Sequence, residues 1–144
     1  MPTTSNKDFN RVMKTLEDHG LLLASDARLP SVAGIVAGEP IKGSWWAHPK
    51  CHEIFRINVR LEETGKVIVC KLISGKQTFV HRRLWPAIAA IGMSRERWQI
   101  NGLSPAARKL LKIIDDEGEV RTNVLSKEKP GEGKAITAAT RELE

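Results

Sequence analysis

The sequence predicts a small α+β protein in which N-terminal helices and a small antiparallel β-meander precede a three-helix bundle. Three observations predict it: apolar residues at helical spacing near the N-terminus, alternating residues in the middle of the chain, and a capped amphipathic segment after residue 103. The 144 residues, of which 41% are hydrophobic and 28% charged, suffice for a core without disulfides or metals. We therefore expect an α+β module at residues 1–102 and a helical bundle at residues 103–144.

Two helices are predicted before residue 40. The apolar residues at i, i+3, i+4 and i+7 spacing are Phe9, Val12, Met13 and Leu16. They predict an amphipathic helix over residues 7–19, capped by Ser5 or Asn6 and ended by Gly20. Residues 29–38 predict a second, short helix with a proline in its first turn and a glycine beyond its end.

The middle of the chain predicts a three-stranded antiparallel meander over residues 53–81. In the segment EIFRINVRL at residues 53–61, apolar and polar side chains alternate, as in a half-buried strand. Its apolar face would consist of Phe55, Ile57, Val59 and Leu61, with Arg56 and Arg60 opposite. Residues 66–73 and 77–81 predict the other two strands. Residues 84–91, LWPAIAAI, then predict a buried helix, and Ser94 is the expected cap of a short helix containing Trp98.

Composition and charge favour an acidic partner. The net charge is +6 and the isoelectric point about 9.6, and residues 51–100 hold 9 Lys and Arg against 4 Asp and Glu. A basic surplus favours polyanions such as nucleic acid. Two cysteines are too few for a secreted disulfide scaffold, and there is neither a signal peptide nor an apolar run of roughly 18 residues. We expect a cytoplasmic protein that does not enter the membrane.

Aromatic residues lie close to these cations in the sequence. Nucleic-acid-binding proteins combine aromatic faces, on which bases stack, with a basic groove that follows the phosphates. Because Trp45 and Trp46 are adjacent, we expect one of them to be partly exposed, whereas Trp85 is expected in the core. The opposite interpretation is that the tryptophans are core residues and the charges a solvated sheet face. The candidate nucleic-acid-binding residues of this region are Trp45, Trp46, Arg56, Arg60, Lys71, Lys76, Arg82 and Arg83.

No motif in the sequence identifies a cofactor, a metal or a reaction. There is no phosphate-binding G-x-x-x-x-G-K-[ST] loop, no G-x-G-x-x-G and no G-x-S-x-G. The spacing of His48, Cys51, His52, Cys70 and His81 matches no known zinc site. We expect neither a metal nor a cofactor. A nuclease or glycosylase using Glu53, His48 or Lys71 is the alternative, and a protein-interaction module is another.

The C-terminal segment contains SPAARKLLKIIDDEGEVRTNVLS and GKAITAATRELE. Ser104 as N-cap, Pro105 at the first helical position and Gly118 as stop predict a helix over residues 105–117. Residues 123–127 predict a short helix capped by Thr122, and residues 134–142 a third helix. This pattern resembles the three-helix part of a winged helix-turn-helix domain.

The resemblance implies that the third helix enters the DNA major groove. Its outward face would consist of Lys134, Thr137, Ala138 and Arg141. The linker SKEKPGEG is longer than the family's turn, the segment is electrically neutral, and the β-hairpin wing that follows the third helix in the family is absent. A partner strand or a second copy of the chain could supply a wing, so a homodimer is allowed.

The middle segment, GSWWAHPKCHEIF…KLISGKQTFVHRRLWPAI, resembles uncharacterised bacterial proteins that also carry a winged-helix tail. Together these features predict a regulatory or repair-associated protein whose partner is nucleic acid, most readily duplex DNA. The basic middle segment would contact phosphate, and the third C-terminal helix would lie in a groove.

Overall fold

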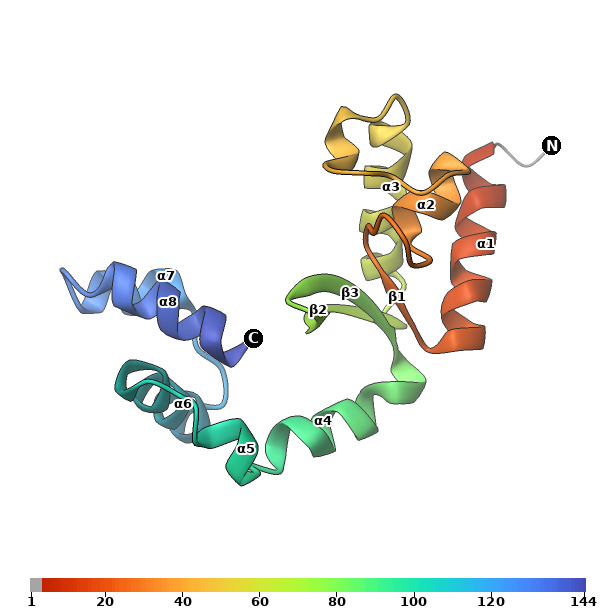
Figure 1. The fold of residues 1–144 in the computed structure, drawn as a ribbon. Coiled ribbons are helices and arrows are strands. Elements are labelled where there is room, and N and C mark those ends of the chain that lie inside the picture. The colour runs from red at the N-terminus through yellow and green to blue at the C-terminus, as the bar shows by residue number, and fades with distance from the viewer. Residues whose placement is uncertain (1–3) are drawn as a thin grey trace. The chain divides into compact units, whose positions relative to one another are not determined.

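The computed structural model describes residues 4–144 and confirms the α+β class, with helices and one three-stranded antiparallel sheet (Figure 1). The chain divides into an N-terminal unit, Met1–Ala89, and a C-terminal unit, Ala90–Glu144. Each unit has its own hydrophobic core. The division lies inside helix α4 (Trp85–Met93), N-terminal to the expected border between residues 102 and 103.

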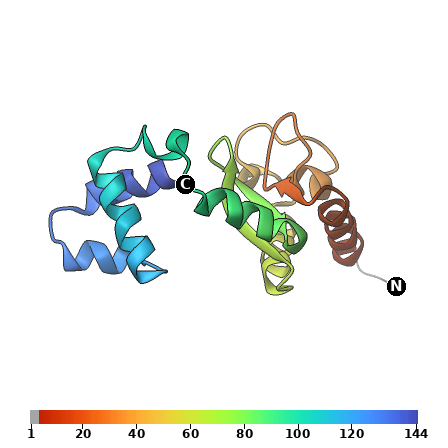
Figure 2. The same ribbon diagram turned by 90° about the horizontal axis from the view of Figure 1, so that it is seen from below.

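The N-terminal unit packs three helices against one face of the sheet (Figures 1 and 2). Strand order is β1–β3–β2, so the last strand lies in the middle. Side chains of all three helices and of β2 and β3 share one buried cluster. In chain order the elements are α1 (Thr4–His19), β1 (Leu21–Leu23), α2 (Val32–Ala37), the 3₁₀ turn η1 (Trp45–Ala47), α3 (Cys51–Glu63), β2 (Val67–Ile73) and β3 (Lys76–His81).

The first two helices form as the sequence predicts, with shifted starts. Helix α1 begins at Thr4, so Ser5 and Asn6 lie within it and neither is the cap. Helix α2 begins at Val32 because the Ser31 hydroxyl accepts a hydrogen bond from the Gly34 amide at 3.0 Å. The proline at position 30 therefore precedes the cap and is not in the first turn.

The predicted strand at residues 53–61 is wrong, because this segment is helix α3. Ile54, Ile57 and Leu61 are at most 1% exposed, whereas Phe55 and Val59 are 47% and 39% exposed. A helix places i, i+3 and i+7 on one face, so Ile54 joins the core and Phe55 leaves it. The predicted meander over residues 53–81 is therefore also wrong. The third strand of the observed sheet is β1, which pairs with β3.

The predicted hairpin of β2 and β3 is confirmed. The strands pair antiparallel, with Val69 opposite Phe79. Ser74 and Gly75 join them with φ of 51° and 68°, the positive values that a two-residue type I′ turn requires at both positions.

One ion pair fastens the loop after β1 to the hairpin. The Asp26 carboxylate accepts hydrogen bonds from the amides of Arg28 and Leu29, both at 2.8 Å, and pairs with the Lys76 ammonium. The Lys76 hydrogen bond and then the two amides hold the pKa of Asp26 well below its usual range. Since the folded pKa is below the unfolded value of about 3.9, the ionised carboxylate stabilises the fold above about pH 4. This stabilisation is lost as the pH falls further.

The Asp26→Asn variant is therefore expected to unfold at a lower temperature than the native protein at neutral pH. The difference in melting temperature should shrink as the pH falls from about 4 toward 2, because the unfolded chain then gains a proton at Asp26 that the folded protein does not take up. Circular dichroism melts over a pH series measure both effects. Asp18→Asn is the matched control, since Asp18 pairs with Lys14 on the exposed surface of α1. A difference that stays constant down to about pH 2 would contradict the role assigned to Asp26.

The C-terminal unit groups three helices around a small core (Figures 1 and 2). The helices are α6 (Pro105–Glu117), α7 (Thr122–Glu128) and α8 (Gly133–Leu143), preceded by α5 (Arg97–Ile100). The predicted Ser104 cap is confirmed: its hydroxyl accepts from the Ala107 amide at 3.2 Å. Glu142 accepts hydrogen bonds from the Ser104 hydroxyl and from the Ser104 amide, the latter at 3.0 Å. These two bonds lower the pKa of Glu142 and join the end of α8 to the start of α6. Arg121, not Thr122, is the cap residue of α7.

Helix α4 is apolar, as predicted, but it is not buried. Ile91 and Met93 are 58% and 75% exposed, and no residue within α4 is buried. Trp85, expected in the core, is half-buried and donates its indole N–H to the Val80 carbonyl at 3.0 Å. Apolar composition predicted burial wrongly here, because it does not show what a helix packs against. Ser94 is not the cap of α5 either, since Glu96 and Gln99 form a capping box there.

Candidate nucleic-acid interface

The outer face of α3 is the most distinctive exposed surface of the N-terminal unit. Its inner face is fixed in the core by Ile54, Ile57 and Leu61, so the opposite face points to solvent. The N-terminal half of this outer face is free of acidic residues, whereas Glu62 and Glu63 lie at the C-terminal end. The exposed residues of α3 before Arg60 are His52, Phe55, Arg56 and Val59.

An aromatic cluster lies beside this face. The rings of Trp45 and Trp46 are stacked, with centroids 4.2 Å apart and planes at 23°, and the Trp46 and Phe55 centroids are 5.7 Å apart. Trp45 packs against the core, whereas Trp46 is 57% exposed, so the sequence was right that one of the pair is exposed. Sequence reasoning missed Phe55 as a surface residue, because the strand assignment placed it in the core. The helical spacing of Ile54, Ile57 and Leu61 was the signal that could have found it.

Two of the candidate arginines are occupied within the fold. The guanidinium carbon of Arg60 lies 3.8 Å from the centroid of the Phe9 ring, and its Nη1 donates to Asn6 Oδ1 at 2.7 Å. Arg83 donates to the backbone carbonyls of Glu17 and Asp18, at 3.1 and 3.0 Å, where α1 ends. A cation there satisfies the last carbonyls and complements the helix dipole. Both side chains therefore hold α1 in place.

The remaining candidate cations of this unit differ in their surroundings. Lys76 pairs with Asp26, and Lys71 is exposed on β2. Arg56 on α3 and Arg82 in the short turn after β3 are exposed, and within residues 4–144 their side chains have no hydrogen-bond or ion-pair partner. These two guanidinium groups can therefore approach a polyanion without breaking a contact in the fold.

In the C-terminal unit, the candidate residues lie along one exposed side of α8. Lys134, Thr137, Ala138 and Arg141 are all exposed, while Ile136 and Ala139 are buried. The Thr137 hydroxyl donates to the Gly133 carbonyl at 2.9 Å, which leaves its oxygen able to accept a further hydrogen bond. Contact of this side with nucleic acid stays a prediction.

The candidate metal ligands and catalytic groups show no assembled site in the part of the chain that the structure describes. There, no group of three or more His, Cys, Asp or Glu side chains could hold a metal ion. Cys51 and Cys70 are free thiols, and burial raises the pKa of Cys70. His48 accepts from the Lys50 amide at 3.1 Å, and one carboxylate oxygen of Glu53 is buried without a hydrogen-bond partner among residues 4–144.

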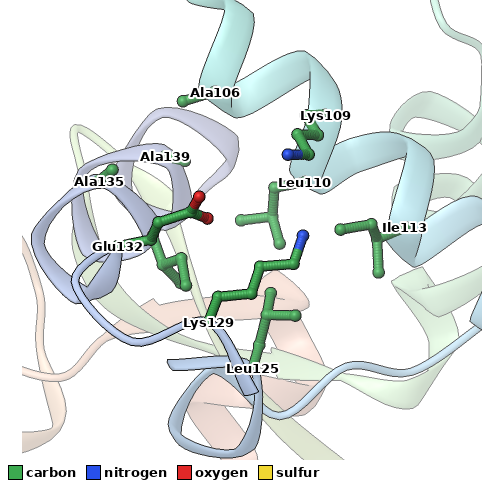
Figure 3. A pocket seen from close by; sticks show the side chains of 10 residues that line it. Ala106, Lys109, Leu110, Ile113, Leu125, Lys129, Glu132, Ala135 and Ala139 are labelled. Carbon is green, nitrogen blue, oxygen red and sulfur yellow. The ribbon is translucent and has the colours of Figure 1, made fainter. Parts of the chain in front are cut away.

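A small apolar pocket lies between α6, α7 and α8 (Figure 3). The side chains of Leu110, Ile113 and Leu125 surround it, and Lys129 and Glu132 stand at its edge. Its volume of about 50 Å³ is far below the roughly 300 Å³ of a typical ligand site, so it is too small for a nucleotide.

No helix among residues 4–144 has the length and apolar character to span a membrane.

The two units share the basic surplus unequally. The N-terminal unit holds 13 Lys and Arg against 8 Asp and Glu, a net charge of +5, and the C-terminal unit holds 10 against 9, a net charge of +1. Long-range attraction of a polyanion therefore favours the N-terminal unit.

The chain was compared with protein families, curated proteins and solved structures. The model of the AlkZ-related family matches residues 6–143. Neither a curated protein nor a solved structure matches the chain. Because the match spans nearly all of its length, the chain belongs to the AlkZ-related family, which is a DNA-repair-related family.

Proposed function

We propose that the protein binds duplex DNA through its N-terminal unit, with α3 as the recognition helix and the β2–β3 hairpin as a wing. One observation carries the proposal: in the order α1–β1–α2–α3–β2–β3, the third helix is followed directly by an antiparallel hairpin. That succession is the one the winged helix-turn-helix resemblance describes. The β2–β3 hairpin follows α3 at the place where such a domain carries its wing.

The geometry of α3 suits this role. In helix-turn-helix proteins, the N-terminal residues of the recognition helix contact base edges, and other residues contact phosphates. The N-terminal half of α3 exposes Arg56 on a helix whose inner face is rigidly packed. An arginine can bond a guanine edge with two hydrogen bonds or neutralise a phosphate. The net charge of +5 in the N-terminal unit and the membership in a DNA-repair-related family support the same partner.

Binding of a labelled duplex, followed by fluorescence anisotropy over a range of salt concentrations, tests the proposal. We expect affinity to fall steeply with salt. Arg56→Ala should weaken binding about five- to tenfold and reduce the steepness of the salt dependence by about one contact. Lys14→Ala is the matched control: it removes the same charge from an exposed position of α1 and should change affinity less than about twofold. Absence of binding at low salt, or equal losses in both variants, would refute the proposal.

Helix α8 is a second, weaker candidate surface. Its exposed Lys134, Thr137 and Arg141 support it, whereas the small net charge of its unit does not. The double variant Lys134→Ala/Arg141→Ala in the same titration measures its share. Release of bases or cleavage of strands in these mixtures would instead favour the processing-enzyme alternative, with Glu53, His48 or Lys71 as the residues to replace.

A further inference from the structure

We infer that Trp46 and Phe55 form a platform on which an unpaired DNA base stacks. The inference rests on the proposed DNA binding by α3 and adds which kind of DNA this surface would bind most tightly. A protein with such a platform would prefer DNA containing an unpaired base over fully paired DNA.

The platform is exposed and supported from below. Trp46 and Phe55 are 57% and 47% exposed, and their ring centroids are 5.7 Å apart. Trp45 stacks on Trp46 at 4.2 Å and itself packs against the core. The exposed indole is therefore held by a fixed neighbour, so little side-chain freedom would be lost when a base covers it.

The two stacked tryptophans belong to the long connection between α2 and α3. Residues 38–50 join α2 to α3, whereas a helix-turn-helix usually needs a turn of only 3–4 residues. Ile41 is buried in the core, and the Lys50 ammonium donates to the Val36 carbonyl at 3.1 Å. The added length thus carries the two stacked tryptophans to the start of α3.

Charge identifies the occupant as nucleic acid and not an apolar protein surface. Residues 40–60 hold four Lys and Arg against one Glu, a net charge of +3. Single-stranded nucleic-acid sites pair aromatic platforms with cations that follow the backbone, and each stacked base contributes about 1–3 kcal/mol. A base within a regular duplex already has a neighbour on both faces. Only a base that has left the helical stack, or was never paired, can therefore cover the indole.

The test compares two labelled probes, a fully paired duplex and the same duplex with one unpaired central base. The native protein should bind the second probe about fivefold more tightly or better, the lower end of what one stacked base contributes. Trp46→Leu and Phe55→Leu should each remove most of this preference, which is measured as the ratio of the two affinities so that a change in binding common to both probes cancels. Trp98→Leu is the matched control, because it removes an indole that is 73% exposed in the C-terminal unit, and it should keep the preference.

The outcomes separate this inference from the proposed function. Salt-dependent binding of the paired duplex without any preference would overturn the platform and leave DNA binding by α3 intact. Failure to bind either probe would overturn both. A preference that survives in Trp46→Leu and Phe55→Leu, or self-association in size-exclusion chromatography that these variants abolish, would also overturn the platform.

Discussion

Replacement of Ile57 by alanine is expected to lower the free energy of unfolding of the N-terminal unit by about 2–5 kcal/mol, whereas Phe55→Ala should cost less than about 1 kcal/mol. Ile57 is 1% exposed among the residues of the main core, so its truncation removes buried apolar surface and leaves a cavity. Phe55 lies two positions away on the same helix and is 47% exposed. Urea denaturation followed by tryptophan fluorescence measures both changes.

This pair of variants also tests the helix itself. If residues 53–61 were a strand, Phe55 and Ile57 would point to the same face, and the two substitutions would have similar costs. A large cost for both variants would therefore contradict the assignment of α3. Val59→Ala adds a third measurement, since Val59 shares the exposed face with Phe55 and should behave like it.

The Gly20→Ala variant is expected to lose about 3 kcal/mol of stability in the N-terminal unit. Gly20 joins α1 to β1 with a φ of 84°, in the left-handed region that disfavours side chains. An added Cβ would also lie 2.5 Å from the Leu84 Cδ1 and 3.0 Å from an Arg83 nitrogen. The methyl group would thus disturb Leu84 and the guanidinium that caps α1.

Gly43→Ala separates the two causes of this loss. Gly43 has a φ of 81°, but nothing lies within 4 Å of the position its Cβ would occupy. Only backbone strain applies there, and the expected cost is about 1 kcal/mol. Thermal unfolding of both variants gives the comparison. Equal losses would mean that Leu84 moves aside at no cost, against the close packing inferred at Gly20.

Local signals explain which elements could be predicted from the sequence. Ser104, Pro105 and Gly118 bound α6 as predicted, because caps depend on neighbouring residues alone. The segment EIFRINVRL was mistaken because its apolar residues satisfy both a period of two and a period near 3.6. Contacts with α1 and α2 decide between them, and these come from distant parts of the chain.

The sequence predicts which residue types the candidate site contains, but not which of their side chains are free to contact nucleic acid. Arg56, Arg60 and Arg83 look equivalent in the sequence. Only the fold brings Phe9 beneath Arg60 and the end of α1 beside Arg83, through contacts between residues far apart in the chain. Arg56, by contrast, stays available because its side chain has no hydrogen-bond or ion-pair partner among residues 4–144.

The division of the chain inside α4 bears on how the protein can be dissected. At the start of this helix, the Trp85 indole donates a hydrogen bond to the Val80 carbonyl of the N-terminal unit. Near its end, the Ile91 carbonyl accepts hydrogen bonds from the side chains of Ser94 and Gln99 of the C-terminal unit, both at 2.8 Å. If the chain is divided anywhere within α4, one of the two fragments loses a hydrogen-bond partner or ends in a partial helical turn with unsatisfied backbone groups. Separately expressed halves should therefore overlap, each retaining residues 85–93 in full.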